Sequence, residues 1–129
     1  MTILVRRPTS AFDDVGGSEK LVSRTVEMSR QRDDAAGALA ALRARVGNVA
    51  AVSAFSTLGV GQPRKVSRDE FVAVDVGYNS AFARACREAG VTHFSLLSSV
   101  GTSDSARSWY LRVKAAAEAA VRNLGFPRV

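Results

Sequence analysis

The chain has 129 residues, enough for one small domain, and we treat residues 1–129 as a single unit. Its hydrophobic content of 47% argues against disorder, and its single cysteine excludes an intramolecular disulfide. The net charge of +6 favours anionic partners, but no basic run exceeds two residues and basic residues do not alternate with aromatic ones, which argues against nucleic acid.

The sequence shows no sign of a membrane span or an export signal. Ile3-Leu4-Val5 is too short for the apolar core of a signal peptide, and no apolar stretch is long enough to cross a bilayer. We therefore expect a soluble chain located in the cytoplasm, with no membrane partner.

Three strands and one helix are predicted in the first 55 residues. Short apolar runs predict the strands, and apolar residues at helical spacing behind an acidic cap predict the helix. In chain order the elements are a strand at Thr2–Arg6, a strand at Leu21–Met28, a helix from Asp33 or Asp34 to Val46, and a strand at Val49–Phe55. The last strand consists mostly of small apolar residues, as expected of a parallel strand covered on both faces.

Two glycines after the third strand have the spacing that begins a dinucleotide-binding fingerprint. Gly59 and Gly61 match its first two glycines, but Arg64 stands where the third would be. Pro63 lacks the backbone amide that a phosphate would need. The fingerprint therefore fails in this loop.

An amphipathic helix is predicted at Phe71–Ala89. Its apolar stripe comprises Phe71, Val74, Tyr78, Phe82, Ala85, Cys86 and Ala89. Because Cys86 lies on this stripe, we interpret it as a core residue and not as a nucleophile. His93, which follows, has no second histidine and no nearby cysteine to form a metal site, so we expect no metal and assign it a structural role.

The C-terminal third begins with a strand that ends in two serines. The apolar run Phe94–Leu97 predicts a buried strand, which breaks at Ser98 and Ser99 and turns at Gly101. The helix that follows is expected to end near Gly125, a glycine suited to a left-handed C-terminal cap.

This helix carries a tyrosine and a lysine on one face. Tyr110 and Lys114 are four residues apart, so a helix places them side by side. A neighbouring ammonium stabilises the phenolate and makes tyrosine a better proton donor near neutral pH, and a serine at the strand end could bind the same substrate oxygen. The pattern predicts a site that moves a proton to or from a carbonyl, while a surface tyrosine above a solvated lysine would give the same spacing.

Several motifs between about Ser53 and Val129 carry a family resemblance. They are AGVTHF, the strand end HFSLLSSVG, and the motif YLRVK with the helix AAAEAAVRNLGF behind it. With these motifs the chain resembles an atypical short-chain dehydrogenase/reductase and is most similar to the Tat-interacting-protein type. The resemblance implies an α/β, Rossmann-like doubly wound parallel sheet that binds NADP(H) and reduces a small carbonyl substrate by hydride transfer. It also implies a catalytic set of Ser99, with Ser98 as the alternative, Tyr110 and Lys114.

The resemblance further implies where NADP(H) would be held. Arg6 and Arg7 would contact the 2′-phosphate at the end of a strand, although solvated charges are equally common there. Gly59 would lie near the cofactor ribose and phosphates, and Lys114 would hold the nicotinamide ribose. Asp75 occupies a place where many relatives have an asparagine near the active site.

Compared with this family, the chain begins at the second strand and ends where the sixth begins. The glycine-rich first strand and turn, which cradle the pyrophosphate, would be absent, as would the C-terminal substrate-binding part. We therefore expect an incomplete Rossmann-like sheet, a fragment that is inactive as given. An alternative from another class is a regulatory module that keeps the fold, senses the cofactor and binds a protein partner.

Overall fold

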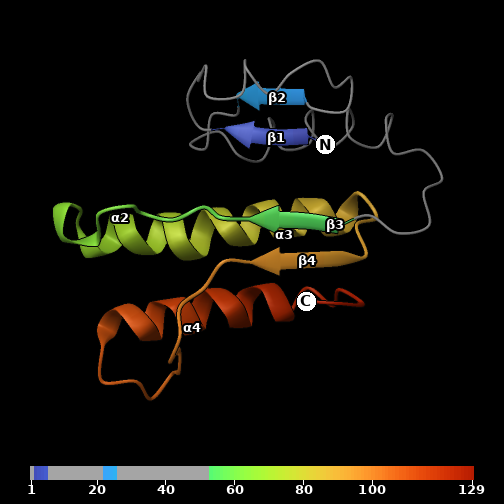
Figure 1. Cartoon of the computed structure of the whole chain (residues 1–129). Helices are drawn as coiled ribbons and strands as arrows, with labels where there is room; N and C mark the ends of the chain where they lie inside the picture. Colours follow the sequence, from blue (N-terminus) through green and yellow to red (C-terminus); the bar gives the residue numbers. More distant parts are fainter. Residues whose placement is uncertain (1, 6–21, 26–52) are drawn as a thin grey trace.

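The computed structural model describes residues 2–5, 22–25 and 53–129, which Figure 1 shows in colour. Its strands form two parallel pairs. The first pair is β1 (Thr2–Val5) with β2 (Val22–Thr25), and the second is β3 (Ser53–Ser56) with β4 (His93–Leu96). Each strand overlaps a predicted one, whereas the predicted helix ending at Val46 lies outside the described residues.

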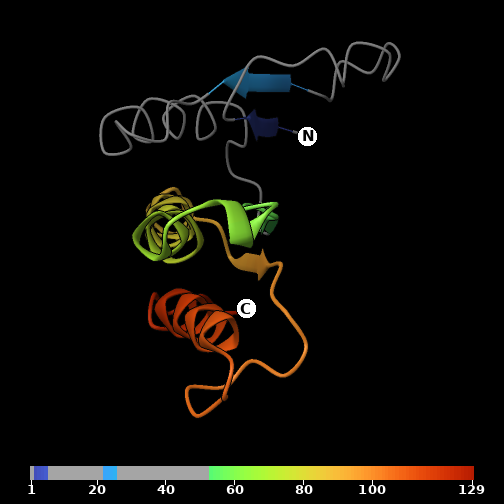
Figure 2. The same ribbon diagram turned by 90° about the vertical axis from the view of Figure 1, so that its left-hand side faces the viewer.

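The order of the described strands is that of a doubly wound sheet without its first strand. From one side to the other the order is β2, β1, β3, β4 (Figure 1 and Figure 2), and the four arrows point the same way in the view of Figure 1. Among the described strands β1 pairs only with β2, and β3 only with β4. In a sheet of order 3-2-1-4-5, a first strand would lie between β1 and β3. The expected incomplete sheet is therefore observed.

The outer edge of β4 has a partner from the end of the chain. Arg128 forms a parallel bridge with His93, and the amide of Phe94 donates to the carbonyl of Arg128 at 3.0 Å. This pairing lies where the resemblance placed the beginning of a sixth strand.

A long helix connects β3 to β4. It consists of α2 (Arg68–Val72), a π-helical segment (Ala73–Tyr78) and α3 (Asn79–Glu88). It begins one residue after Ser67, whose hydroxyl accepts a hydrogen bond from the amide of Glu70 at 3.1 Å and so satisfies a free N–H of the first turn. The predicted start at Phe71 is thus about one turn too late.

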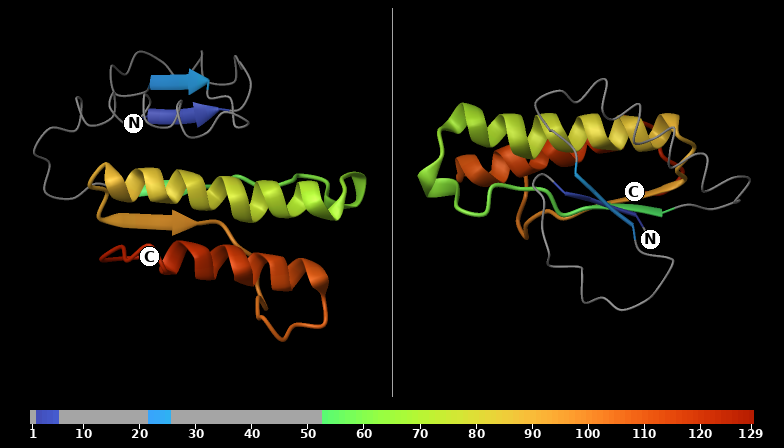
Figure 3. Two further views of the ribbon diagram at one scale, coloured as in Figure 1. Left: turned by 180° about the vertical axis from the view of Figure 1, so that it is seen from behind. Right: turned by 90° about the horizontal axis from the view of Figure 1, so that it is seen from above.

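The second long helix is α4 (Trp109–Arg122). It is followed by Gly125, whose φ of 68° is the left-handed conformation predicted for a helix end. Figure 3 shows α3 and α4 side by side on one face of the β3–β4 pair. No helix in the described part of the chain is long and apolar enough to span a bilayer.

The π-helical segment shifts the buried face of the connecting helix. A π-helix closes its hydrogen bonds one residue later than an α-helix, so the residues that follow it move by one position. Phe71, before the segment, is buried as predicted. Directly after it, Asn79 and Ala83 are buried where a regular helix predicted Tyr78 and Phe82, which are half-buried, whereas Ala85 and Cys86 further along are buried as predicted.

The core joins β4 to both helices. Its buried members are Ala83, Cys86, Val91, Phe94, Val121 and Phe126. Phe94 stacks on Phe126 with ring centroids 5.2 Å apart, and a fully buried phenylalanine contributes roughly 1.5–3 kcal/mol. Burial raises the pKa of the Cys86 thiol to about 12, so this residue is a protonated core residue, as predicted.

Candidate active site

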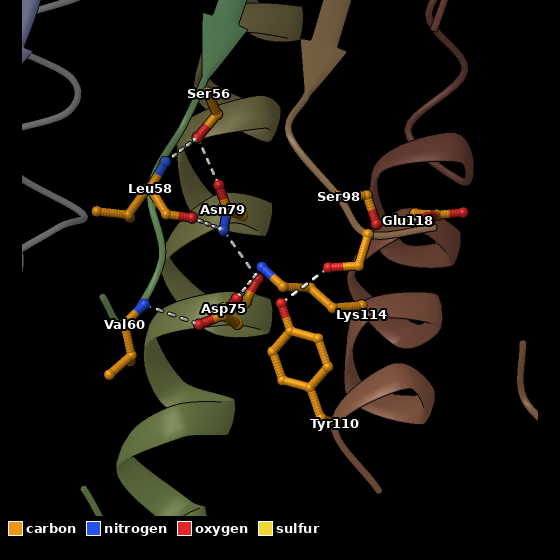
Figure 4. A network of polar contacts seen from close by, with 10 residues as sticks. Ser56, Leu58, Val60, Asp75, Asn79, Ser98, Tyr110, Lys114 and Glu118 are labelled. Atoms are coloured by element: carbon orange, nitrogen blue, oxygen red, sulfur yellow. Dashed lines mark hydrogen bonds and ion pairs between the residues drawn. The ribbon is translucent and has the colours of Figure 1, made fainter. Parts of the chain in front are cut away.

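Polar side chains gather at the carboxyl ends of β3 and β4. The loops that leave these two parallel strands emerge at the same edge, between the connecting helix and α4 (Figure 4). In open parallel sheets this edge is where ligands bind. The site therefore lies where the fold predicts one.

A serine from the loop after β4 contacts a tyrosine on α4. The Ser99 Oγ and Tyr110 hydroxyl oxygens are 2.8 Å apart, and either group can donate. Gly101, with a φ of 83°, allows the tight turn of this loop. Ser98, the alternative, donates instead to Glu118 at 2.5 Å. Of the two adjacent serines, Ser99 is the one that the structure brings to Tyr110.

The lysine of the predicted set forms a buried ion pair. Lys114 Nζ contacts Asp75 Oδ1, and the two side chains are only 12% and 1% exposed. The ammonium lies 5.9 Å from the centre of the Tyr110 ring. The second carboxylate oxygen of Asp75 accepts from the amide of Val60 at 3.2 Å. Asp75 thus connects the loop after β3 to α4.

Sequence reasoning missed Asn79, which fastens the same loop to the helix. Its Oδ1 accepts from Ser56 Oγ at 2.5 Å, and its Nδ2 donates to the carbonyl of Leu58 at 3.1 Å and to that of Asp75 at 2.9 Å. The sequence did contain a signal for Asn79: it lies four residues after Asp75 on a helix face that is otherwise apolar. The regular helical period concealed it, because that period places Tyr78 on the apolar stripe and not Asn79.

Gly59 lies directly against the ion pair. A Cβ built on it would be 3.6 Å from Asp75 Oδ1 and 3.7 Å from Lys114 Nζ, which are ordinary contact distances. The loop predicted to approach the cofactor therefore meets the lysine predicted to hold the nicotinamide ribose. The two predicted phosphate ligands, Arg6 and Arg7, lie outside the described residues.

A glutamate on α4 is the second residue that sequence reasoning missed. Glu118 Oε1 accepts from Ser98 at 2.5 Å and from Thr102 Oγ1 at 2.8 Å, while Oε2 pairs with Arg122 at 3.1 Å. The Ser98 hydrogen bond lowers the pKa of this carboxyl; Thr102 and Arg122 lower it further, and partial burial opposes them. The signals in the sequence were a lone acid in an alanine-rich helix and its position four residues after Lys114, on the face that carries Tyr110.

His93 lies at the start of β4, away from these strand ends. Its ring nitrogens are 3.1 Å from Ser53 Oγ and 3.4 Å from Ser95 Oγ. Within the described residues, no three His, Cys, Asp or Glu side chains are grouped so that they could hold a metal ion.

Comparisons with known proteins find relatives in sequence and a solved structure with a similar fold. It is 41% identical to protein HTATIP2 of Rattus norvegicus over 75 residues, which are 58% of this chain and 31% of that protein. It is 36% identical to protein FMP52-1 of Scheffersomyces stipitis over 74 residues, 57% of this chain and 33% of that one. Triphenylmethane reductase from Citrobacter sp. superposes on 98% of this chain and 37% of its own, with a TM-score of 0.64 at 16% identity. No protein-family model matches the chain.

These findings confirm the resemblance to atypical short-chain dehydrogenases/reductases of the Tat-interacting-protein type. The likeness to the Citrobacter enzyme confirms the fold class, an α/β Rossmann-like arrangement whose sheet is incomplete here. The chain spans about a third of the length of the curated relatives it matches.

The relatives correct the predicted location. Protein FMP52-1 of Scheffersomyces stipitis and protein FMP52 of Debaryomyces hansenii are mitochondrial proteins by name. The cytoplasmic prediction is therefore wrong. It rested on the lack of a recognisable signal, and such a lack does not identify a compartment.

Proposed function

We propose that this chain carries the catalytic residues of an NADP(H)-dependent oxidoreductase that reduces a carbonyl group. The observation that carries the proposal is the 2.8 Å contact between Ser99 and Tyr110 at the carboxyl ends of parallel strands. The similarity to NAD(P)-binding proteins of the short-chain dehydrogenase/reductase type supports it at the level of the family.

In this proposal the two hydroxyls act on one substrate oxygen. Tyr110 donates a proton to the carbonyl oxygen, and Ser99 donates a hydrogen bond to it, so that the developing negative charge is stabilised. Since the hydroxyls already lie 2.8 Å apart, one oxygen can contact both without rearrangement of the loop. A bound nicotinamide would supply the hydride to the carbonyl carbon, and the product would be an alcohol.

The residues around Lys114 suit a nicotinamide cofactor. An ammonium has three N–H donors, so the contact with Asp75 leaves capacity for ribose hydroxyls. Gly59 places backbone without a side chain beside this ammonium, which favours close approach by a ligand. For the 2′-phosphate that distinguishes NADP from NAD, Arg6 and Arg7 are the proposed ligands.

The buried ion pair also supports a second candidate function. Asp75 neutralises the charge of Lys114, and a lysine held in this way is compatible with a module that senses the cofactor without turning over a substrate. Such a module would pass the signal to a protein partner. Cofactor binding without reduction of any carbonyl would favour this second function.

An NMR titration of the chain with NADPH tests the first step of both functions. We expect chemical-shift changes concentrated at Gly59, Ser99 and Lys114, the residues that line the proposed cofactor site. Millimolar NADPH without changes at these residues would overturn both functions. If a Lys114→Met variant shows the same chemical-shift changes, Lys114 is not a ligand of the cofactor.

A turnover assay then separates the two functions. NADPH oxidation is followed with a panel of aldehydes and ketones, and a Ser99→Ala/Tyr110→Phe variant serves as the blank. Turnover above this blank supports the reductase. Binding at the site together with turnover equal to the blank supports the sensing module.

A further inference from the structure

The loop that carries Ser99 is fastened to α4 on both sides of this serine. Ser98 and Thr102 donate to the same oxygen of Glu118, at 2.5 and 2.8 Å. Ser99 lies between these two anchors and turns its hydroxyl to Tyr110. One carboxylate thus holds the loop at the residue before the predicted catalytic serine and at the third residue after it.

We propose that Glu118 is a positioning residue whose carboxylate, by binding Ser98 and Thr102, holds the hydroxyl of Ser99 against Tyr110. The positioning is a property of this chain by itself. Its meaning for catalysis rests on the proposed function.

The geometry of α4 supports this role. Tyr110, Lys114 and Glu118 follow one another at intervals of four residues, so they share one face of the helix. Figure 4 shows all three on α4, with the Lys114 side chain reaching Asp75 and Glu118 lying beside Ser98. The same face therefore carries the proposed proton donor, the proposed cofactor ligand and the group that fixes the loop.

A carboxylate is well suited to this task. Hydrogen bonds from a hydroxyl to an ionised acceptor are shorter and roughly twice as strong as those between neutral groups. The Glu118 side chain is 21% exposed, so competition from water is reduced. Hydrogen bonding lowers the pKa of this carboxyl, which keeps it ionised at neutral pH.

The contact of Glu118 with Arg122 provides a matched control. It uses the other carboxylate oxygen, and the arginine side chain is 67% exposed. An exposed pair of this kind contributes little to stability. An Arg122→Ala variant therefore alters the surroundings of Glu118 without touching its contacts to the loop.

The test measures the order of the loop by ¹⁵N NMR relaxation at residues 99–102, in the full chain and without cofactor. Glu118→Ala should make this loop more mobile and abolish the close contact between the Ser99 side chain and the Tyr110 ring. Glu118→Gln keeps an oxygen that can accept from both hydroxyls, so it should preserve the loop, as should Arg122→Ala. Amide exchange in the core, at Phe94 and Val121, should be equal in all variants.

Two results would overturn the proposal. One is a loop that stays as ordered in Glu118→Ala as in the parent chain, and the other is equal loosening in Glu118→Ala and Arg122→Ala. If Glu118→Ala does not fold, a Ser98→Ala/Thr102→Val variant removes the same two contacts from the loop side. It must reproduce the loosening, or the proposal fails.

The catalytic consequence is measured separately. Where the chain turns over a carbonyl, Glu118→Ala should lower kcat by about 10²-fold with the KM for NADPH nearly unchanged, because misplacement of a catalytic group affects the chemical step. Glu118→Gln should recover most of this loss. If Glu118→Ala loosens the loop but the chain does not bind NADPH, the positioning role of Glu118 stands and only the proposed function is refuted.

Discussion

Replacing Asp75 with asparagine tests whether the buried ion pair holds the site together. Asp75 is 1% exposed and is the ionic partner of Lys114, which is 12% exposed. Asparagine has a similar shape and can still accept the hydrogen bond from Val60, so the substitution removes mainly the charge. The lysine would then remain as a nearly buried cation without its counterion.

The expected loss follows from this burial. Removing one partner of a buried ion pair costs about 3–5 kcal/mol, and we expect about 3 kcal/mol here because Lys114 keeps some contact with water. This is a large part of the roughly 5–15 kcal/mol that stabilises a domain. With an m-value of about 1.5 kcal/mol/M, the midpoint of urea unfolding should fall by about 2 M.

Trp109, the single tryptophan, is a suitable reporter of this unfolding. Its ring packs 5.3 Å from that of Phe71, so its fluorescence should change when the helices separate. An Asp75→Asn/Lys114→Met variant should recover most of the loss, since it leaves no unpaired charge. Arg122→Ala, which breaks an exposed pair, should cost less than about 1 kcal/mol. The reasoning is refuted if Asp75→Asn costs no more than this control, or if the double variant is as unstable as the single one.

Three further predictions concern the chemistry of the site. In a complete version of the protein, Tyr110→Phe removes only the hydroxyl that contacts Ser99, so turnover should fall by about 10²–10⁴-fold with NADPH affinity nearly unchanged; near-normal turnover would exclude Tyr110 as the acid. Replacing Arg6 and Arg7 with alanine should weaken NADPH binding by about 1.5–3 kcal/mol per arginine and should weaken NADH binding much less. Equal losses for the two cofactors in calorimetric titrations would show that the two arginines act only through their positive charge. Folding lowers the pKa of Glu118 from its ordinary value of 4.5, so ionised Glu118 stabilises the folded chain. This contribution to stability is complete above pH 4.5 and is lost as the pH falls through the lower pKa of the folded state. In unfolding curves measured at several pH values, Glu118→Gln should remove this loss of stability at low pH. The same dependence of stability on pH in the parent chain and the variant would contradict this role of Glu118.

Local sequence patterns were sufficient for the described strands, for α4 and for part of the site. Two of these patterns involve only residues that are close in sequence. They are the apolar run that forms β4 and the spacing of Tyr110 and Lys114 on α4. The left-handed Gly125 was predictable for the same reason. These features follow from backbone preferences and periodicity, which a single sequence records.

The contacts that organise the site could not be predicted in this way. Asn79 is buried because a π-helical segment shifts the helix register, and a regular period of 3.6 residues does not anticipate such a segment. The pairing of Asp75 with Lys114 joins residues 39 positions apart, and that of Glu118 with Ser98 joins residues 20 apart. Contacts of this kind depend on how the two helices pack against the strands, which the pattern of either helix alone does not specify.

The last prediction concerns the edge of β3 on the side of β1. No described strand pairs with this edge, and Phe55, in the middle of β3, is 67% exposed. An unpaired strand edge that carries an exposed aromatic side chain favours association with a second chain. We therefore expect the chain to self-associate in a concentration-dependent way in sedimentation experiments.

Phe55→Lys should suppress the association because lysines of two approaching strands repel each other. Leu97→Lys is the matched control: Leu97 is 61% exposed but follows β4, so its substitution should leave the association unchanged. Equal suppression by both variants would attribute the effect to added charge, and a monomer at all concentrations would show that the edge of β3 is protected.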